Sequence, residues 1–195
     1  PTGCEWTRLQ DCIDVRDGTH ASPKGASGKS TYPLITSKNF IDGEIDFNSA
    51  RRISKADNIE ISKRSRVKVD DVLFSVIGGN IGNQVMVKDA LPLSIKNVAL
   101  FKYYSEDYTV PKFFKKYTEN LAESLQSQAS GGAQPFISLG ALRKLLFPLP
   151  PAVEQYRIVT KVDELMVLCD DLKQQLNKAQ TTQMQLTDTV LENAF

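Results

Sequence analysis

Apolar and polar residues alternate with different periods along the chain, and each period predicts a different kind of element. Between residues 30 and 105, short runs rich in Val, Ile, Leu, Phe and Tyr are separated by Gly and Asn clusters, a pattern typical of β-strands. Asp42-Gly43 lies between apolar flanks, and because both residues tolerate a positive φ the pair predicts a hairpin over residues 40–46. We expect one sheet system to contain the runs at residues 32–36, 72–77, 84–88 and 98–104.

Helical spacing follows in the next part of the chain. Pro111 suits the first turn of a helix. Apolar residues then recur every three or four positions, a stripe expected to pack in the core, at Phe113, Phe114, Tyr117, Leu121 and Leu125. Residues 130–135 predict a polar loop, after which Ser138 can cap a short helix that reaches Leu145. Prolines at positions 148, 150 and 151 then predict an extended tract.

The sequence after Pro151 contains no Gly or Pro and carries a heptad pattern, which predicts one long helix. Steps of four and three give a seam in which nine of eleven residues are apolar: Ile158, Val162, Leu165, Cys169, Leu172, Leu176, Ala179, Gln183, Leu186, Val190 and Asn193. The helix would extend roughly 63 Å, longer than a compact domain of this size is wide, so we expect the seam to need a second helix. Gln183 and Asn193 would set its register. The alternative is a surface helix packed on its own domain.

These elements together predict a mixed α+β fold. Residues 1–147 would form a β-rich globular domain, and residues 148–195 a Pro-rich junction and one long coiled-coil-type α-helix. The composition agrees, since 41% of the 195 residues are apolar and 24% are charged. The apolar runs fall far short of the roughly 20 residues that cross a bilayer, and the first six residues do not resemble a secretory signal. We therefore expect a cytoplasmic protein without a membrane partner, in which Cys4, Cys12 and Cys169 are reduced, buried thiols.

Positive charge is concentrated in the middle of the chain. Residues 51–150 hold 15 basic and 9 acidic side chains, whereas the formal net charge of the whole chain is only +1. Residues 51–68 alone contain seven cations and only two carboxylates, Asp57 and Glu60. A local basic face suits a polyanion such as duplex DNA, because phosphates attract cations and release counterions on binding. The alternative for this segment is a solvated loop.

Groups that could catalyse a reaction are scarce in this sequence. His20, the single histidine, lies in the turn-like sequence Asp17-Gly18-Thr19-His20, with neither a second histidine for a metal nor a supporting serine and acid. Residues 78–82 are glycine-rich but lack the Lys and Ser or Thr of a phosphate-binding loop, so we expect a tight turn there. Asp171 and Lys173 lie beside the seam, where charges are usual. The chain is therefore expected to bind and scaffold, with no catalytic residue and no metal site.

The sequence resembles a known family. Residues 148–159, Pro-Leu-Pro-Pro-Ala-Val-Glu-Gln-Tyr-Arg-Ile-Val, and residues 161–170 are similar to the junction between target recognition domain and helical spacer in specificity (S) subunits of type I restriction-modification systems. Upstream, Asp17-Gly18-Thr19-His20, the strand at residues 71–75 and the Ser-Gly-Gly-Ala-Gln sequence at residues 130–134 resemble the same domain type. The resemblance covers essentially the whole chain and is loosest over residues 38–70, where such domains differ with the DNA that they read.

This resemblance implies a function and partners. Residues 1–147 would be a DNA target recognition domain that reads one half of a bipartite target in double-stranded DNA. S subunits carry two such domains, and their two helices pair antiparallel. This chain has one domain and one helix, so it would be a fragment, which its opening at Pro1 favours, or a half-subunit that pairs with a copy of itself. The alternatives are a recognition fragment of a single-chain restriction-methylation enzyme and a coiled-coil adaptor without a DNA role.

The implied protein partners carry the cofactors. Methyltransferase (M) subunits would bring S-adenosylmethionine, and restriction (R) subunits would bring ATP and Mg²⁺. The resemblance therefore implies that this chain itself binds no cofactor and acts as a non-catalytic subunit that docks the M and R subunits.

Cations are expected to contact phosphates and hold the register, while arginines and carboxamides on neighbouring loops read guanine and adenine edges in the major groove. The candidate DNA-binding residues are Thr19, His20, Lys24, Arg51, Arg52, Lys55, Lys63, Arg64, Arg66, Asn80, Asn83, Lys112, Lys115, Lys116 and Gln134. The candidate helix–helix interface is the part of the seam between residues 158 and 190.

Overall fold

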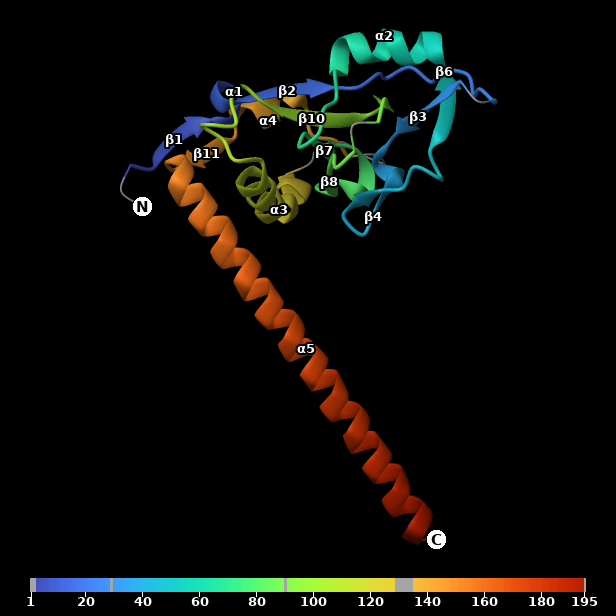
Figure 1. Cartoon of the computed structure of the whole chain (residues 1–195), viewed down its shortest axis with the longest axis vertical. Coiled ribbons are helices and arrows are strands. Elements are labelled where there is room, and N and C mark those ends of the chain that lie inside the picture. The colour runs from blue at the N-terminus through green and yellow to red at the C-terminus, as the bar shows by residue number, and fades with distance from the viewer. Residues whose placement is uncertain (1–2, 29, 90, 129–134, 195) are drawn as a thin grey trace. The chain divides into compact units, whose positions relative to one another are not determined.

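The contacts of the chain divide it into two units, Pro1–Gln155 and Tyr156–Phe195 (Figure 1). The first unit ends after the boundary expected at residue 147, because strand β11 (Leu146–Leu149) pairs with β1 (Glu5–Arg8). Buried Gln155 belongs to the first unit as well, since its carboxamide hydrogen-bonds the backbone at Val110, Tyr108 and Pro150. The computed structural model describes residues 3–28, 30–89, 91–128 and 135–194.

A four-stranded antiparallel sheet forms the centre of the first unit. Three of its strands fall within the predicted runs at residues 72–77, 84–88 and 98–104, which confirms those predictions. The fourth, β2 (Ile13–Asp17), was not predicted. In the spatial order of the sheet, the strands are β2 (Ile13–Asp17), β10 (Val98–Tyr103), β7 (Val72–Ser75) and β8 (Gln84–Met86).

The predicted run at residues 32–36 belongs to a different sheet, so the expectation of one sheet system is wrong. Strand β3 (Thr31–Ile35) pairs antiparallel with β6 (Arg51–Ser54) and parallel with β9 (Ser94–Ile95). The two sheets pack together through one buried apolar cluster that includes Ile35 and Ile95 from the second sheet and Leu73 and Leu100 from the first. Alternation along a strand predicts its buried face, but it does not tell which neighbour the strand pairs with.

The predicted hairpin is present as β4 (Phe40–Ile41) and β5 (Glu44–Ile45). Its turn residues adopt the positive φ that the sequence requires, 51° at Asp42 and 78° at Gly43. The hairpin is therefore confirmed.

Helix α3 (Pro111–Gln128) covers the other face of the central sheet. Phe74 and Phe101 of the sheet lie edge-to-face with ring centroids 5.6 Å apart, and Phe101 is 5.2 Å from Phe114 of the helix. Phe113 and Leu125 are buried as well. The expected packing of the aromatic stripe in the core is confirmed, and each such ring contact adds to the free energy of burial.

Helix α2 (Lys55–Ser65) occupies the segment for which a basic face or a solvated loop was expected. Ser54 caps it: the Ser54 hydroxyl accepts a hydrogen bond from the Asp57 backbone N–H at 3.1 Å and donates to the Asp57 carboxylate at 2.6 Å. The loop alternative is therefore wrong. The helix lacks a broad apolar stripe, because Asn58 and Ser65 are its buried residues, and periodicity alone does not reveal such a helix.

Short elements complete the first unit. Ser138 caps α4 (Leu139–Lys144) as predicted, accepting a hydrogen bond from the Ala141 N–H at 3.1 Å. The extended tract predicted around Pro148 is confirmed by β11. The short helices are α1 (Leu9–Cys12), the 3-10 turns η1 (Ser37–Asn39) and η2 (Gly78–Asn80), and α4 (Leu139–Lys144).

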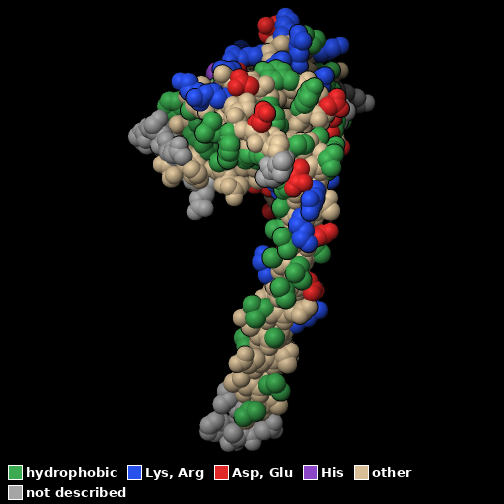
Figure 2. Space-filling model, turned by 90° about the vertical axis from the view of Figure 1, so that its left-hand side faces the viewer, with side chains coloured by type: hydrophobic (Ala, Val, Ile, Leu, Met, Phe, Trp, Pro, Cys, Tyr) green, Lys and Arg blue, Asp and Glu red, His purple; other side chains and the backbone are tan. Residues whose placement is uncertain are grey.

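Helix α5 (Ala152–Ala194) confirms the predicted long helix, with 43 residues. Its apolar seam residues are exposed from Leu165 to Val190, and Figure 2 shows apolar side chains at intervals along it. Ile158 and Val162 are half-buried, while the side chain of Asn193 lies outside the described residues. Among the described residues, no helix is both long and apolar enough to span a bilayer.

The three cysteines have different environments, so the expectation that all are buried is wrong. All three are free thiols, but only Cys12 is buried; Cys4 is half-buried and Cys169 is exposed. Cys169 is exposed because it lies on the seam of α5, where an apolar position in the heptad pattern does not by itself provide a covering partner.

Candidate nucleic-acid interface

The chain at Asp17-Gly18-Thr19-His20 leaves the first sheet and crosses to the second, where its backbone packs closely on β9. A side chain at Gly18 would place its Cβ 2.0 Å from the carbonyl oxygen of Ile95, so only glycine fits there. The Thr19 N–H donates to the same Ile95 oxygen at 2.9 Å. This crossing places His20 beside the turn that follows β9.

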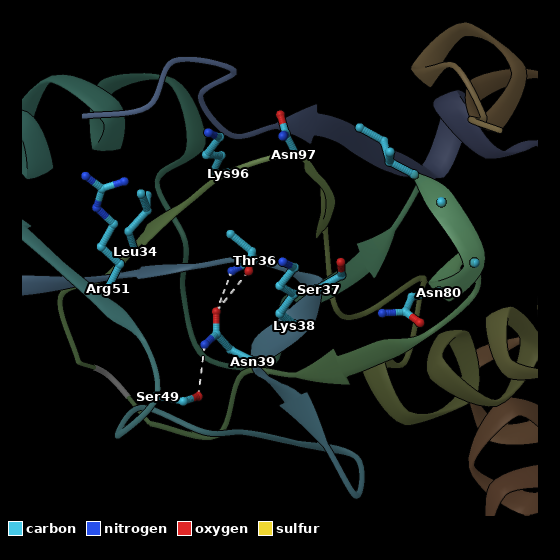
Figure 3. Close-up of a pocket in the computed structure, with 13 residues that line it drawn as sticks. Leu34, Thr36, Ser37, Lys38, Asn39, Ser49, Arg51, Asn80, Lys96 and Asn97 are labelled. Carbon is cyan, nitrogen blue, oxygen red and sulfur yellow. Dashed lines mark hydrogen bonds between the residues drawn. The ribbon is translucent and has the colours of Figure 1, made fainter. Parts of the chain in front are cut away.

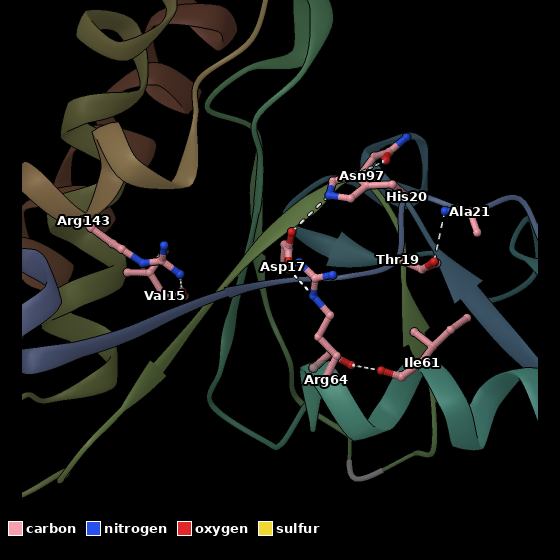
Figure 4. A network of polar contacts seen from close by, with 10 residues as sticks. Val15, Asp17, Thr19, His20, Ala21, Ile61, Arg64, Asn97 and Arg143 are labelled. Carbon is pink, nitrogen blue, oxygen red and sulfur yellow. Dashed lines mark hydrogen bonds and ion pairs between the residues drawn. The ribbon is translucent and has the colours of Figure 1, made fainter.

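Asp17 is the centre of a polar network that ties this crossing to α2 (Figure 4). Its buried carboxylate accepts hydrogen bonds from Arg64 of α2, at 2.6 Å from Nε and 2.5 Å from the terminal nitrogen. His20 lies 3.1 Å from Asp17 through Nε2 and 3.1 Å from the Asn97 side-chain oxygen through Nδ1. The network fixes the positions of three segments that are distant in sequence.

A polar cleft of about 600 Å³ lies next to this network (Figure 3). It contains three cations, Lys38, Arg51 and Lys96, together with carboxamides and hydroxyls, and no carboxylate belongs to its described lining. Positive charge without a neighbouring acid attracts anions such as phosphate. The lining residues are Leu34, Thr36, Ser37, Lys38, Asn39, Ser49, Arg51, Ile77, Gly78, Gly79, Asn80, Lys96 and Asn97.

Buried Asn39 lines the cleft, and both its side-chain oxygen and its amide are bonded within the protein. Its oxygen accepts from the Thr36 N–H at 2.9 Å and the Thr36 hydroxyl at 3.1 Å, and its amide donates to Ser49 at 3.1 Å. These bonds close the 3-10 turn η1, which presents Lys38 at the surface. Asn39 therefore holds the cleft in shape and leaves recognition to its neighbours.

One end of the cleft is the glycine-rich turn at residues 78–82, which forms the tight turn that was predicted. Gly78 has a φ of 74°, and the Ile81 side chain is buried beneath the turn. A Cβ at Gly82 would lie 2.7 Å from the Ala122 Cβ, so the turn packs closely on α3. The backbone is anchored on both sides, and Asn80 lies at its exposed tip.

Several predicted DNA-binding side chains are engaged within the protein. This group consists of Arg52, Lys63, Arg64 and Asn83, and their partners are, in order, Thr31, Glu60, Asp17 and the Phe40 carbonyl. A second group is exposed and, in the part of the chain that the structure describes, its side chains form no hydrogen bond or ion pair: Lys24, Arg51, Lys55, Arg66 and Asn80. The structure thus distinguishes candidates that are bonded within the protein from candidates that are free, which a count of charges does not do.

The lysines of α3 lie away from the cations of α2. Figure 1 shows α2 and α3 on opposite sides of the sheet that contains β2 and β10, and Figure 2 shows Lys and Arg side chains gathered over α2. Lys115 is mostly buried and pairs with Glu119 at 2.5 Å, while Lys112 is exposed and Lys116 is half-buried. Gln134 lies outside the described residues.

Sequence reasoning missed Lys38, Lys96 and Asn97. Lys96 donates to the Ser22 hydroxyl, and Asn97 has a φ of 55° in the turn between β9 and β10. An Asn between two apolar runs is a turn signal, and it could have indicated this site. Lys38 has no comparable signal, because its role depends on two sheets that meet only in the fold.

A buried ion pair supports the end of α2. Lys102 Nζ lies 2.5 Å from the Asp71 carboxylate and donates to the Arg66 carbonyl at 2.9 Å, and both charged side chains are buried. Asp71 also accepts from the Lys68 N–H at 2.7 Å. Burial raises the pKa of Asp71 above its ordinary value, although Lys102 and Lys68 act in the opposite direction. In the described residues, no three His, Cys, Asp or Glu side chains gather as a metal site would require.

Comparisons with known proteins agree with this fold. The HsdS subunit from Thermoanaerobacter tengcongensis superposes with a TM-score of 0.68 at 22% identity, over 89% of this chain and 40% of that chain. A structure described as the basis of complex assembly and conformational transition of the type I R-M system gives the same TM-score over 41% of its chain. The fold is therefore that of type I specificity subunits, which confirms the mixed α+β class.

Sequence comparison defines the family. The model described as "Type I restriction modification DNA specificity domain" matches residues 1–193, and the chain belongs to that family. The EcoEI specificity subunit of Escherichia coli is 35% identical over 206 residues, covering 100% of this chain and 34% of that protein. The EcoBI specificity subunit is 28% identical, over 86% of this chain and 35% of that protein. The chain thus spans about a third of these relatives, and the resemblance seen in the sequence is confirmed.

Proposed function

We propose that this chain is a non-catalytic DNA-recognition module that reads one half of a bipartite target for a type I restriction-modification complex. The observation that carries the proposal is the cleft, in which Lys38, Arg51 and Lys96 meet carboxamides without a carboxylate in the described lining. Cations position a protein on phosphates, and carboxamides and arginines read base edges. Membership of the specificity family supports the same role.

The proposal includes partners and location. The chain docks M and R subunits, which bring S-adenosylmethionine, ATP and Mg²⁺, and it binds none of these cofactors itself. The complex acts on DNA in the cytoplasm. The names of the relatives support this context, because they are specificity subunits of type I restriction enzymes.

Two measurements test this function in the assembled protein. The subunit that contains this chain is co-expressed with a separate M subunit, and the purified complex is titrated with duplex DNA at increasing salt. We expect co-purification, and an affinity whose logarithm falls linearly with the logarithm of salt concentration. Failure to co-purify would favour a single-chain enzyme, and a complex that binds no duplex at low salt would favour an adaptor without a DNA role.

We also propose that the seam on α5 pairs with the helix of a second specificity half or of a second copy. Leu172 and Leu176 are more than half exposed, which supports a missing partner, since a buried leucine adds about 1.5–3 kcal/mol. Leu172→Glu with Leu176→Glu should abolish association in sedimentation experiments, whereas Gln174→Glu, off the seam, should not. Association that survives the double change would contradict the pairing.

A further inference from the structure

We propose that Arg51 and Asn80 are the side chains with which the cleft reads bases, and that Lys38 between them contacts a phosphate. The inference rests on the proposed function and extends it to specificity-determining residues. Figure 3 shows Arg51 and Asn80 at opposite ends of the cleft and Lys38 between them. They come from β6, η2 and η1, three elements that are separated in the sequence.

The polar side chains of the cleft differ from their sequence neighbours in whether they are free to bind. Arg52 and Asn83 are of the same residue types and lie one and three positions away, but their side chains bond Thr31 and the Phe40 carbonyl. Arg51, Asn80 and Lys38 are exposed, and within the described part of the chain their side chains make no hydrogen bond or ion pair. A group that reads a base must have its donors and acceptors free in the unbound protein, or break an internal bond first.

Arg51 is suited to guanine. It pairs with Leu34 in the register of β6 with β3, so its backbone is fixed by the sheet. Its guanidinium lies near Gly25, where an added Cβ would be 3.7 Å from Nε. The side chain therefore starts from a backbone held in the sheet, and its donors are free. The planar fork of donors matches the O6 and N7 acceptors that guanine presents in the major groove.

Asn80 is suited to adenine. It lies at the tip of a turn that buried Ile81 anchors and that Gln126 of α3 supports through a hydrogen bond of 3.3 Å to the Gly79 carbonyl. The anchored turn leaves the carboxamide exposed, with its donor and its acceptor both free. That pair matches the N7 acceptor and N6 donor of adenine. A lysine point charge such as Lys38 positions the backbone and carries no sequence information.

The test uses two pairs of matched variants in the assembled methyltransferase complex. Arg51→Lys and Asn80→Ala remove the proposed base contacts, while Arg52→Lys and Asn83→Ala change the same residue types beside them. A randomised duplex library is offered at fixed salt, and the methylated molecules are sequenced. Thermal unfolding of each variant checks that the domain remains folded.

We expect Arg51→Lys to reduce discrimination about tenfold at one guanine position, and Asn80→Ala to do so at one adenine position. The two control variants should stay within about twofold of the wild type. Arg51→Lys keeps its charge, so the salt dependence of binding should not change. A Lys38→Ala variant should weaken binding to all sequences equally.

Two results would overturn the assignment. In one, Arg51→Lys and Asn80→Ala keep the wild-type preference at every position; in the other, Arg52→Lys and Asn83→Ala relax it equally. A uniform loss of affinity with Arg51→Lys would make Arg51 a phosphate contact and would also overturn it. These outcomes are distinct from failure of the proposed function, in which the wild-type complex itself shows no sequence preference.

Discussion

Replacing Lys102 by Met should leave a buried carboxylate without its counter-charge. Lys102 Nζ is 2.5 Å from Asp71, and the side chains are only 11% and 5% exposed. Breaking such a pair by removing one partner costs about 3–5 kcal/mol, because the remaining charge stays desolvated. The loss of the 2.9 Å bond to the Arg66 carbonyl adds to this cost. We therefore expect Lys102→Met to lower the free energy of unfolding by about 3–5 kcal/mol at pH 7.5.

The pH dependence has a defined sign. Burial raises the pKa of Asp71 above its ordinary 3.8, so the folded protein binds a proton more tightly than the unfolded chain does. Ionisation of Asp71 therefore costs stability as pH rises from 3.8 through the raised value. Without Lys102 that pKa rises further, and the deficit should shrink as pH falls.

Urea unfolding of the wild type, Lys102→Met and the double variant Asp71→Asn with Lys102→Met measures these effects. The double variant has no unpaired charge and should recover most of the loss. A Lys102→Met protein as stable as the wild type at pH 7.5, or one whose deficit grows on acidification, would refute the reasoning.

Two further predictions concern the first unit and the seam. Gly18→Ala should lower the free energy of unfolding by at least about 2 kcal/mol, because its Cβ would lie 2.0 Å from the Ile95 oxygen. Gly79→Ala, which has open space around it, should change the free energy of unfolding by about 0.5 kcal/mol or less. Equal melting temperatures for the two variants would contradict the close approach at Gly18. Burial raises the pKa of the Cys12 thiol to about 11, whereas Cys169 is exposed. Alkylation at pH 8, followed by mass spectrometry, should therefore be slow at Cys12 and fast at Cys169. Equal rates would contradict the burial of Cys12.

The elements that could be predicted from the sequence are those with a strong local signal. The hairpin follows from Asp42-Gly43, and α3 and α5 follow from apolar periodicity. Helix α2 escaped prediction because its signal is a cap, Ser54 with Asp57, and not an apolar stripe. A search for caps as well as for periodicity would have found it.

The candidate site depends on contacts that no spacing rule contains. Arg51 and Asn80 were among the predicted residues, but so were Arg64 and Lys63, which the fold pairs with Asp17 and Glu60. A charge count gives every cation the same weight. Only the meeting of β6, η1 and η2 around one cleft distinguishes the free groups from the engaged ones.

Exchange of the recognition domain tests the central claim most directly. Residues 1–155 of this chain are replaced by the corresponding residues of a relative with a different target, and methylated adenines are mapped in a host that carries the assembled complex. We predict that one half of the bipartite motif changes to that of the relative while the other half stays the same. A motif that is unchanged in both halves would contradict the claim that this domain reads DNA.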